Sequence, residues 1–249
     1  MDSAGHSAPD ADVDALATLG ALDGVASALA GSRDGIDALL RDRGLRRTTP
    51  ELTTESLLRG AIASAELEGS ASSPDEIRSG AGDEIAGSSV RLSTELLALV
   101  PTLRTSPLQA LARLHAVAAS GVVPVDQLGR PRDAESARRL QVLSRRLLEP
   151  TVAPALLVAA VVHAELAVAA PFASHNGLVA RAAERLVLVA RGVDEKSLIV
   201  PEAGHLTLRA AYESNLRAYA EAGGSSGVHA WLLYAAEAYA KAAELSPIR

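Results

Sequence analysis

Residues 169–181, AAPFASHNGLVAR, join two apolar, alanine-rich stretches of the chain. They contain Pro171, the only phenylalanine (Phe172) and an Asn-Gly pair, Asn176 and Gly177. We expect one helix to end before Pro171 and another to begin at Asn176, which leaves free N–H groups at the start of the second helix. Such a start favours anions, and Arg181 lies one turn further on. The segment predicts either a turn that holds a phosphate or an ordinary helix corner without a ligand.

Helical periodicity recurs along the rest of the chain, and strand alternation is almost absent. Aromatic residues make up only 2% of the 249 residues, so alanine, leucine and valine must fill the core. We predict an all-α protein with a solvated, disordered tail over residues 1–10 and a single helical domain over 11–249. The expected helices cover about 12–30, 33–43, 53–67, 74–86, 91–100, 106–119, 133–148, 152–169, 176–191, 205–221 and 226–244.

Composition excludes several classes of function. The net charge is −6 and no basic cluster carries aromatic neighbours, which argues against nucleic acid as a partner. The chain has no cysteine, hence no disulfide or zinc-thiolate site. Its most apolar stretch, residues 151–172, contains His163 and Glu165, so we interpret it as a buried helix that does not cross a membrane. Without a secretory signal, we expect a cytoplasmic location, and the excess of alanine and arginine is typical of a GC-rich bacterial genome.

Residues 163–194, HAELAVAAPFASHNGLVARAAERLVLVARGVD, resemble the central motif of Fic (Fido-fold) proteins, most of which are AMP transferases. The family pattern is His-Pro-Phe-x-(Asp/Glu)-Gly-Asn-Gly-Arg-x-x-Arg, with a histidine seven residues upstream, here His163. The positions that match are Pro171, Phe172, Asn176, Gly177 and Arg181. The positions that differ are Ala170 for the catalytic histidine, Ser174 for the acidic metal ligand, His175 for the first glycine and Leu178 for the first arginine.

A second match lies in RGAIASAELEGS, residues 59–70, which resembles the inhibitory helix of one Fic subclass. Its pattern, (Ser/Thr)-x-x-x-Glu-(Gly/Asn), is met by Ser64, Glu68 and Gly69. The resemblance implies N-terminal helices over residues 11–90 and a Fic core with closing helices over 91–249. It also implies an ion pair between Glu68 and Arg181, the arginine that otherwise holds the nucleotide's γ-phosphate. The alternative is that the two are separate surface charges.

Weaker matches extend the resemblance along the chain. The stretch with His115, Gly129 and Arg130 is similar to a family helix and loop, and Tyr219 and Trp231 fall in segments similar to the closing helices. Fic enzymes usually follow that loop with a β-hairpin flap that positions the target. Here GRPR runs directly into a predicted helix at 133–148, so we expect the flap to be missing.

The resemblance implies a Fic fold whose chemistry is lost. Ala170 cannot act as a base, Ser174 cannot supply a carboxylate to Mg²⁺, and Leu178 carries no guanidinium. We therefore expect a pseudoenzyme without AMP-transferase activity, catalytic residues or cofactor, acting through an unknown protein partner or as a homodimer. One alternative is a nucleotide- or phosphate-sensing module, with Mg²⁺ if a nucleotide binds, that uses Asn176, Gly177 and Arg181. Others are an enzyme of altered chemistry in a reshaped pocket, with His175 as acid or base, and a scaffold without ligand.

The remaining polar residues are expected to have structural roles. The histidines lack the spacing of a metal site. We expect His163 to be a hydrogen-bonded core residue, His205 to lie at a helix start, and His175 to face solvent or cap a helix. Ser174 suits the N-cap of the following helix, and Phe172 suits a core anchor for the loop.

Overall fold

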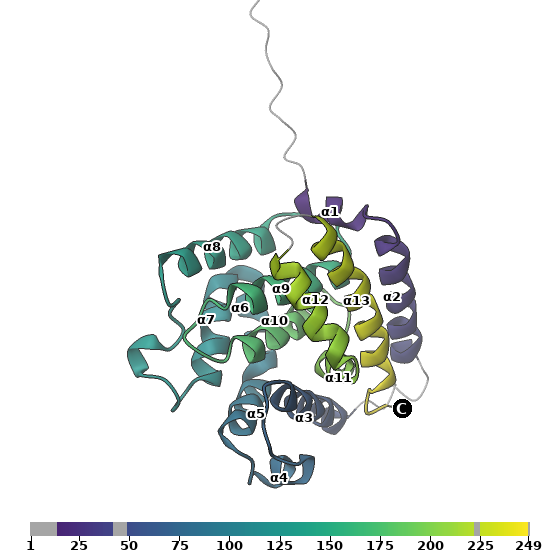
Figure 1. The fold of residues 1–249 in the computed structure, drawn as a ribbon. Helices are drawn as coiled ribbons and strands as arrows, with labels where there is room; N and C mark the ends of the chain where they lie inside the picture. The colour runs from purple at the N-terminus through teal and green to yellow at the C-terminus, as the bar shows by residue number, and fades with distance from the viewer. Residues whose placement is uncertain (1–13, 42–48, 222–224, 249) are drawn as a thin grey trace, which may run out of the picture.

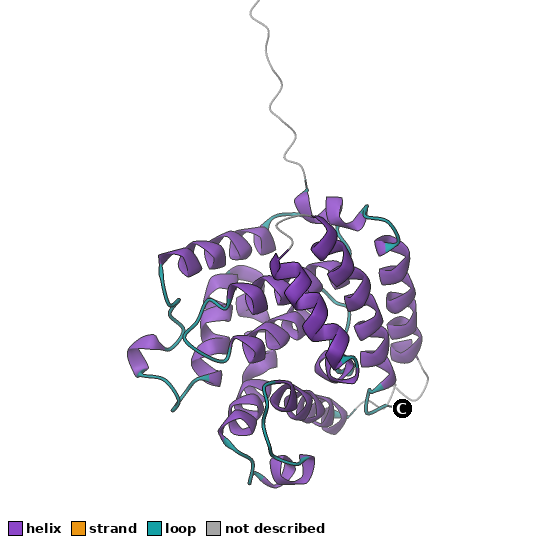
Figure 2. Ribbon diagram, viewed as in Figure 1, coloured by secondary structure: helices purple, strands orange, loops and turns teal. Residues whose placement is uncertain are grey.

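The computed structural model describes residues 14–41, 49–221 and 225–248, and every regular element in those ranges is helical (Figure 2). The tail expected over residues 1–10 lies outside the described residues. The α-helices are α1 (Ala15–Gly20), α2 (Val25–Arg41), α3 (Pro50–Leu67), α4 (Pro74–Ser79), α5 (Glu84–Leu96), α6 (Val100–Thr105), α7 (Pro107–Ala118), α8 (Ala134–Leu148), α9 (Ala155–Ala169), α10 (Asn176–Ala190), α11 (Pro201–Thr207), α12 (Arg209–Glu221) and α13 (Ser225–Glu244). Two 3₁₀ turns, η2 (Leu97–Leu99) and η3 (Val125–Gln127), complete the set.

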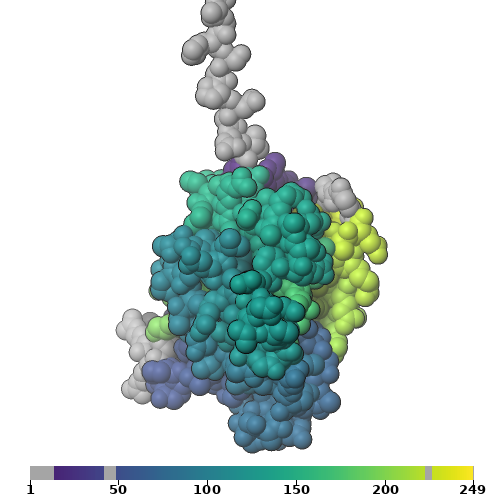
Figure 3. Space-filling model, turned by 90° about the vertical axis from the view of Figure 1, so that its left-hand side faces the viewer, coloured from purple at the N-terminus to yellow at the C-terminus, as the bar shows by residue number. Residues whose placement is uncertain are grey.

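Two antiparallel helices, α9 and α10, form the centre of the molecule (Figure 1). They are almost entirely buried, because α9 is apolar on all sides and α10 is surrounded by other helices. Helices α2, α12 and α13 cover one side, and α5, α6 and α7 cover the other. The α3–α5 segment, blue in Figures 1 and 3, forms one end of the molecule, opposite α1 and α8. Residues 170–175, which we call the motif loop, join α9 to α10. Because both helices are buried, the core fixes the position of this loop.

The expected helix boundaries are wrong in four places. One is the helix expected over 91–100, which falls on the end of α5, the η2 turn and the start of α6. The first break falls at residues 21–24, where Gly24 has φ +72°, and α2 runs unbroken through Gly31. The stretch 74–86 is divided because Gly80 caps α4 at φ 78° and the Asp83 carboxylate caps α5. The stretch 205–221 is divided at Leu208, and α11 begins earlier, at Pro201. Capping residues decide these breaks, and apolar periodicity does not reveal them.

The main hydrophobic core is continuous from Val25 in α2 to Ala243 in α13 and is mostly aliphatic. A small second cluster of Ala65, Ile77 and Ala86 lies between α3, α4 and α5. Helix α9, which carries the most apolar stretch of the sequence, is part of the main core. None of the described helices is long and apolar enough to span a bilayer.

Candidate functional site

The loop between α9 and α10 is closed by one side chain. The Asn176 Oδ1 accepts a hydrogen bond from the Phe172 N–H at 2.9 Å, and its Nδ2 donates to the Phe172 carbonyl, also at 2.9 Å. Ala170, which caps α9, has the left-handed φ of 41°. Asn176 therefore fixes the loop backbone. Because both hydrogen-bonding ends of its side chain are used for this, Asn176 has a structural role.

Phe172 anchors the loop in the core as expected, because it is 1% exposed. Its ring stacks on the His115 imidazole of α7, with ring centres 4.3 Å apart and planes 3° apart. The Gly129 N–H donates to His115 Nδ1 at 2.9 Å, so the other ring nitrogen carries the proton. Gly129 has φ +70°, and a Cβ there would lie 2.7 Å from the Ala112 carbonyl oxygen. His115 and Gly129, two residues of the weaker sequence match, therefore support the Phe172 ring.

The His115 Nε2 is buried and has no hydrogen-bond partner among the described residues. Burial and, to a smaller extent, the nearby His175 lower the pKa of His115 to about 4. The ring is therefore neutral at pH 7, and its Nε2–H is an unused donor beside the loop.

No hairpin follows Gly129, and the chain enters α8 at Ala134 through a short irregular segment, all of which is described. The expected absence of a flap is thus confirmed. The residue of this segment that holds the motif loop is Arg132, which the sequence did not single out. Its N–H donates to the Pro171 carbonyl at 2.9 Å, and its guanidinium donates to the Ala169 carbonyl at 3.3 Å. Arg130, the residue chosen from the sequence, is exposed.

His175 takes the left-handed φ of 57° at the N-cap of α10, so the loop keeps a positive φ where the family has glycine. Histidine tolerates this region better than most residues. The expectation that Ser174 caps α10 is wrong: the N-cap residue is His175, without a side-chain cap bond, and the Ser174 hydroxyl lies 2.7 Å from His175 Nδ1. Half-burial lowers the pKa of His175, against a weaker opposing effect of the Glu68 charge, so its imidazole is neutral near pH 7.

Leu178 occupies the position of the family's first arginine and is 1% exposed. It belongs to the main core cluster. Together with the methyl of Ala170 and the hydroxyl of Ser174, it leaves three positions of the motif without an ionisable group. Those three side chains offer no base, metal ligand or cation.

The expected ion pair between Glu68 and Arg181 is present, with Glu68 Oε1 2.6 Å from Arg181 Nη2. Arg181 is 2% exposed and donates also to the Ser64 hydroxyl at 2.8 Å, the Ser64 carbonyl at 3.2 Å and the Tyr212 hydroxyl at 3.2 Å. Glu68 keeps 29% of its side-chain surface accessible at the end of α3. Ser64 and Glu68 therefore act together on one guanidinium. Gly69, the third residue of the N-terminal motif, follows with φ +89°.

The Glu68 carboxylate also fills the hollow at the start of α10. A Cβ built on Gly177 would overlap Glu68 Oε1 and would lie 3.2 Å from the Arg181 guanidinium. A side chain at this position would displace the Glu68 carboxylate. The free N–H groups and dipole at the start of a helix stabilise a nearby carboxylate. The Glu68 carboxylate thus lies beside Gly177 and Arg181, the residues from which the sequence predicted an anion-binding turn.

A buried polar network on α9, α10 and α11 was not predicted. Glu184 Oε2 lies 2.9 Å from His163 Nδ1 and 2.8 Å from His205 Nε2, and all three side chains are 0% exposed. The outer nitrogens of the histidines contact the hydroxyls of Tyr212 at 3.0 Å and Tyr234 at 2.7 Å. The Tyr239 hydroxyl donates to the other oxygen of Glu184 at 2.8 Å.

Both ring nitrogens of each histidine and both oxygens of Glu184 have a hydrogen-bond partner. The three inner ligand atoms of this network lie within 4.8 Å of one another, as a metal site requires, but each already has a hydrogen-bond partner. Burial lowers the pKa of His163 to about 4, and the two histidines hold the pKa of Glu184 well below its usual range against its burial. We interpret the network as structural. His163 is a core residue as expected, but the helix-start role expected for His205 is wrong, because it is buried in the fifth position of α11.

A second unpredicted centre lies beside it on α10. Arg185, 1% exposed, donates to Glu202 Oε2 at 3.0 Å, the Ser56 hydroxyl at 2.5 Å and the Ser197 hydroxyl at 2.7 Å. A Cβ on Gly60 of α3 would overlap the guanidinium. The only sequence signal for either centre is the pair of charged residues, Glu184 and Arg185, inside an otherwise apolar helix.

Trp231 and Tyr219, the two aromatic residues predicted to lie in the closing helices, both form hydrogen bonds to α9. Trp231 is fully buried and its indole N–H donates to the Ala160 carbonyl at 2.8 Å. Tyr219 is half-buried and its hydroxyl donates to Glu165 Oε1 at 2.6 Å. Both residues connect the closing helices to α9, and neither contacts the motif loop through these hydrogen bonds.

No protein-family model and no curated protein matches the sequence, so the comparison rests on solved structures. A Fic family protein from Desulfovibrio desulfuricans G20 superposes with a TM-score of 0.73 at 17% identity, covering 88% of this chain and 73% of that one. A fragment of Fic-1 from C. elegans gives 0.68 at 16% identity, covering 88% and 71%. A variant of that fragment gives 0.67 at 18%, covering 92% and 72%. The arrangement of the helices therefore agrees with that of these structures: the chain has the Fic fold.

Proposed function

We propose that this protein is a Fic-fold pseudoenzyme, without AMP-transferase activity, that acts by binding a protein. The observation that carries the proposal is Ala170, a methyl side chain at the position of the family's catalytic histidine. The Glu68 carboxylate supports it, because it lies against Gly177 and Arg181, where the resemblance implies that a nucleotide phosphate would bind. A general base typically contributes about 10²–10⁴-fold to a rate, and Ser174 and Leu178 remove further charge stabilisation.

The decisive experiment is transfer of labelled AMP from ATP with Mg²⁺, using the purified protein alone and with a lysate. We expect no transfer by the natural sequence. We also expect none by Glu68→Gly, which frees the hollow but restores no base. A variant that combines Glu68→Gly with Ala170→His, Ser174→Asp, His175→Gly and Leu178→Arg is the matched comparison. Transfer by Glu68→Gly alone would refute the proposal. If His175→Ala then abolished that transfer, the altered-chemistry alternative would replace it.

The proposed mode of action includes a protein partner or a second copy of the chain. Large apolar side chains that are exposed near the α8–α9 connection support this: Leu148 is 53% exposed and Val152 is 88% exposed. Light scattering on the eluting full chain distinguishes a dimer from a 25.6 kDa monomer. If a dimer forms through this surface, Leu148→Glu with Val152→Asp gives a monomer. A monomer at every concentration excludes the homodimer.

The second candidate function is a sensor for a nucleotide or phosphate. The accessibility of Glu68 favours it, because an anion arriving from solvent can compete with this carboxylate for Arg181. Calorimetry with ATP and with CDP-choline, each with and without Mg²⁺, tests it. A sensor predicts binding that tightens in Glu68→Gly and is lost in Arg181→Ala. No heat at millimolar nucleotide in Glu68→Gly eliminates this candidate.

A further inference from the structure

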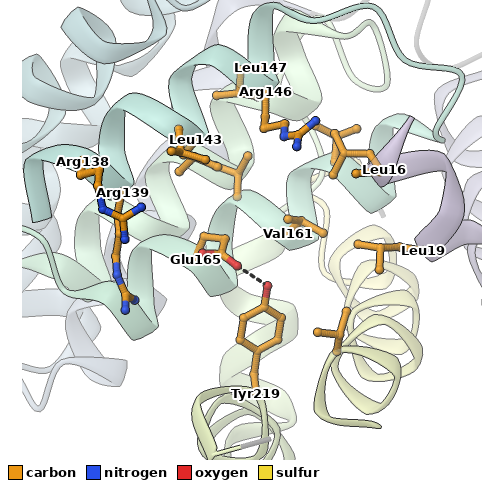
Figure 4. A pocket seen from close by; sticks show the side chains of 15 residues that line it. Leu16, Leu19, Arg138, Arg139, Leu143, Arg146, Leu147, Val161, Glu165 and Tyr219 are labelled. Atoms are coloured by element: carbon orange, nitrogen blue, oxygen red, sulfur yellow. Dashed lines mark hydrogen bonds between the residues drawn. The ribbon is translucent and has the colours of Figure 1, made fainter. Parts of the chain in front are cut away.

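A groove of about 440 Å³ lies between α8 and α9, and its lining contains no residue of the motif loop (Figure 4). Helix α1 contributes to one end, and Tyr219 of α12 and Val228 of α13 contribute to its walls. The volume falls within the range of about 300–1,000 Å³ that is usual for small-molecule sites.

The walls of the groove are mostly aliphatic. Leu143 of α8 and Val161 of α9 form its middle, and Leu16 and Leu19 of α1 lie at the far end in Figure 4. Tyr219 is the one aromatic ring in the lining. Such walls offer a planar base little to stack on, whereas a flexible hydrocarbon chain gains from covering them, at about 0.8 kcal/mol per buried methylene.

Three arginines of α8 give the groove a positive edge. Arg138, Arg139 and Arg146 all contribute to its lining, spaced so that they follow one side of the helix. Their present partners, Glu135 and Glu149, are 53% and 40% exposed, and the contacts span 2.7–3.0 Å. Exposed pairs of this kind contribute little to stability. An incoming carboxylate can therefore take over the guanidiniums without a large loss elsewhere.

The one acidic residue of the lining is Glu165, whose carboxylate accepts the Tyr219 hydroxyl at 2.6 Å in the middle of the groove (Figure 4). An anionic head is repelled from this position. Cationic side chains lie at both ends of the groove, Arg138 and Arg139 at one end and Arg146 beside Leu16 at the other. The end with two guanidiniums attracts a carboxylate more strongly, and the hydrocarbon chain then runs past Leu143 towards α1.

We propose that this groove binds the anion of a medium-chain fatty acid such as laurate. Its carboxylate contacts Arg139 and Arg138, and its alkyl chain lies along Leu143 and Val161 towards Leu16. The segment that precedes α1, MDSAGHSAPDADV, is a poor occupant because it has only two large apolar residues, Met1 and Val13. This site is separate from the motif loop and does not depend on the proposed loss of transferase activity.

Calorimetry of the full chain with sodium laurate below its micelle concentration tests the ligand class. We expect one laurate per chain and binding of dodecyltrimethylammonium, which has the same chain and a cationic head, at least about tenfold weaker. Equal binding of both heads, several sites per chain or no binding of laurate overturns the proposal. Binding to phosphatidylglycerol vesicles without binding to monomeric laurate also overturns it, in favour of a membrane surface.

Matched variants of α8 test the position. Arg139→Glu should weaken laurate binding at least about tenfold. Arg145→Glu makes the same charge change on the same helix at a residue outside the lining and should leave affinity unchanged. Leu143→Trp fills the groove and should abolish binding, with helical circular dichroism as the check of folding. If Arg139→Glu and Arg145→Glu weaken laurate binding equally, the net charge of α8 and not a specific contact attracts the ligand, and the proposal is overturned.

Discussion

Arg181 and Arg185 stand one turn apart on α10, are equally buried, and both reach α3, yet they are held in different ways. The carboxylate on Arg181 comes from Glu68, whose side chain is 29% accessible. The carboxylate on Arg185 comes from Glu202, whose side chain is 6% accessible. Water and dissolved anions can therefore compete at Arg181 and not at Arg185. Two similar guanidiniums on one helix thus make one ion pair that is open to solvent and one that is closed to it.

The largest effect is expected at the closed contact. Arg185→Met leaves Glu202 buried without its cation, and breaking a buried pair costs about 3–5 kcal/mol. Urea unfolding at pH 7 measures this loss. Arg209→Met is the control, because Arg209 makes an exposed pair with Glu213 and should change stability by less than about 0.5 kcal/mol. Equal stability of the two variants would mean that Arg185 is not the stronger attachment of α3.

The next largest effect is a loss of stability in acid, which arises from the network beside Arg185. The pKa of His163 is about 4 in the folded protein and 6.5 when unperturbed, so the unfolded chain binds more protons between these values. Stability is then fully present above pH 6.5 and falls by about 2–3 kcal/mol towards pH 4. The lowered pKa of Glu184 adds a loss below its ordinary value of 4.5.

Urea midpoints at pH 7 and pH 4.5 measure this loss. His163→Gln removes one titrating group and should reduce the dependence between these pH values, whatever its own stability at pH 7. His115, whose pKa is also about 4, keeps its share of the loss in this variant. If the unmutated protein is equally stable at pH 7 and pH 4.5, protonation of the network does not lower the free energy of unfolding, and this prediction is wrong.

The open contact at Arg181 predicts a smaller effect. Glu68→Ala should cost about 1–2 kcal/mol, because solvent screens the pair and Arg181 keeps its bonds to Ser64 and Tyr212. Glu66→Ala, an exposed neighbour on α3, should be close to neutral. The difference in urea midpoint should shrink in 1 M salt. A loss as large as that of Arg185→Met would remove the distinction between the two arginines.

The smallest effect concerns the loop backbone before Arg181. His175→Gly relieves the left-handed conformation but adds freedom to the unfolded chain, so we expect a change below about 1 kcal/mol. His175→Val should cost about 1–2 kcal/mol more than His175→Gly, because a β-branched residue tolerates this φ poorly. Thermal unfolding of the pair measures the difference. Equal melting temperatures would show that the loop is free to change its φ.

The sequence was sufficient for the parts of the molecule that depend on local pattern. The apolar stretches predicted α7, α8, α9, α10 and α13 closely, and the motif residues predicted the Fic fold and the contact of Glu68 with Arg181. It was insufficient where polar groups from distant segments meet. Glu184 and His205 are 21 residues apart, and only the crossing of α10 and α11 shows that they share a hydrogen bond. Buried charges of this kind look like surface charges until their partners are placed.

The missing hairpin after Gly129 has a consequence for recognition. A β-strand edge presents unpaired N–H and carbonyl groups, onto which an extended peptide can add as a further strand. The described segment from Gly129 to α8 offers no such edge, and the backbone N–H of Arg132 is already used by Pro171. A peptide that adds as a strand therefore has no β-strand edge to pair with in this described segment.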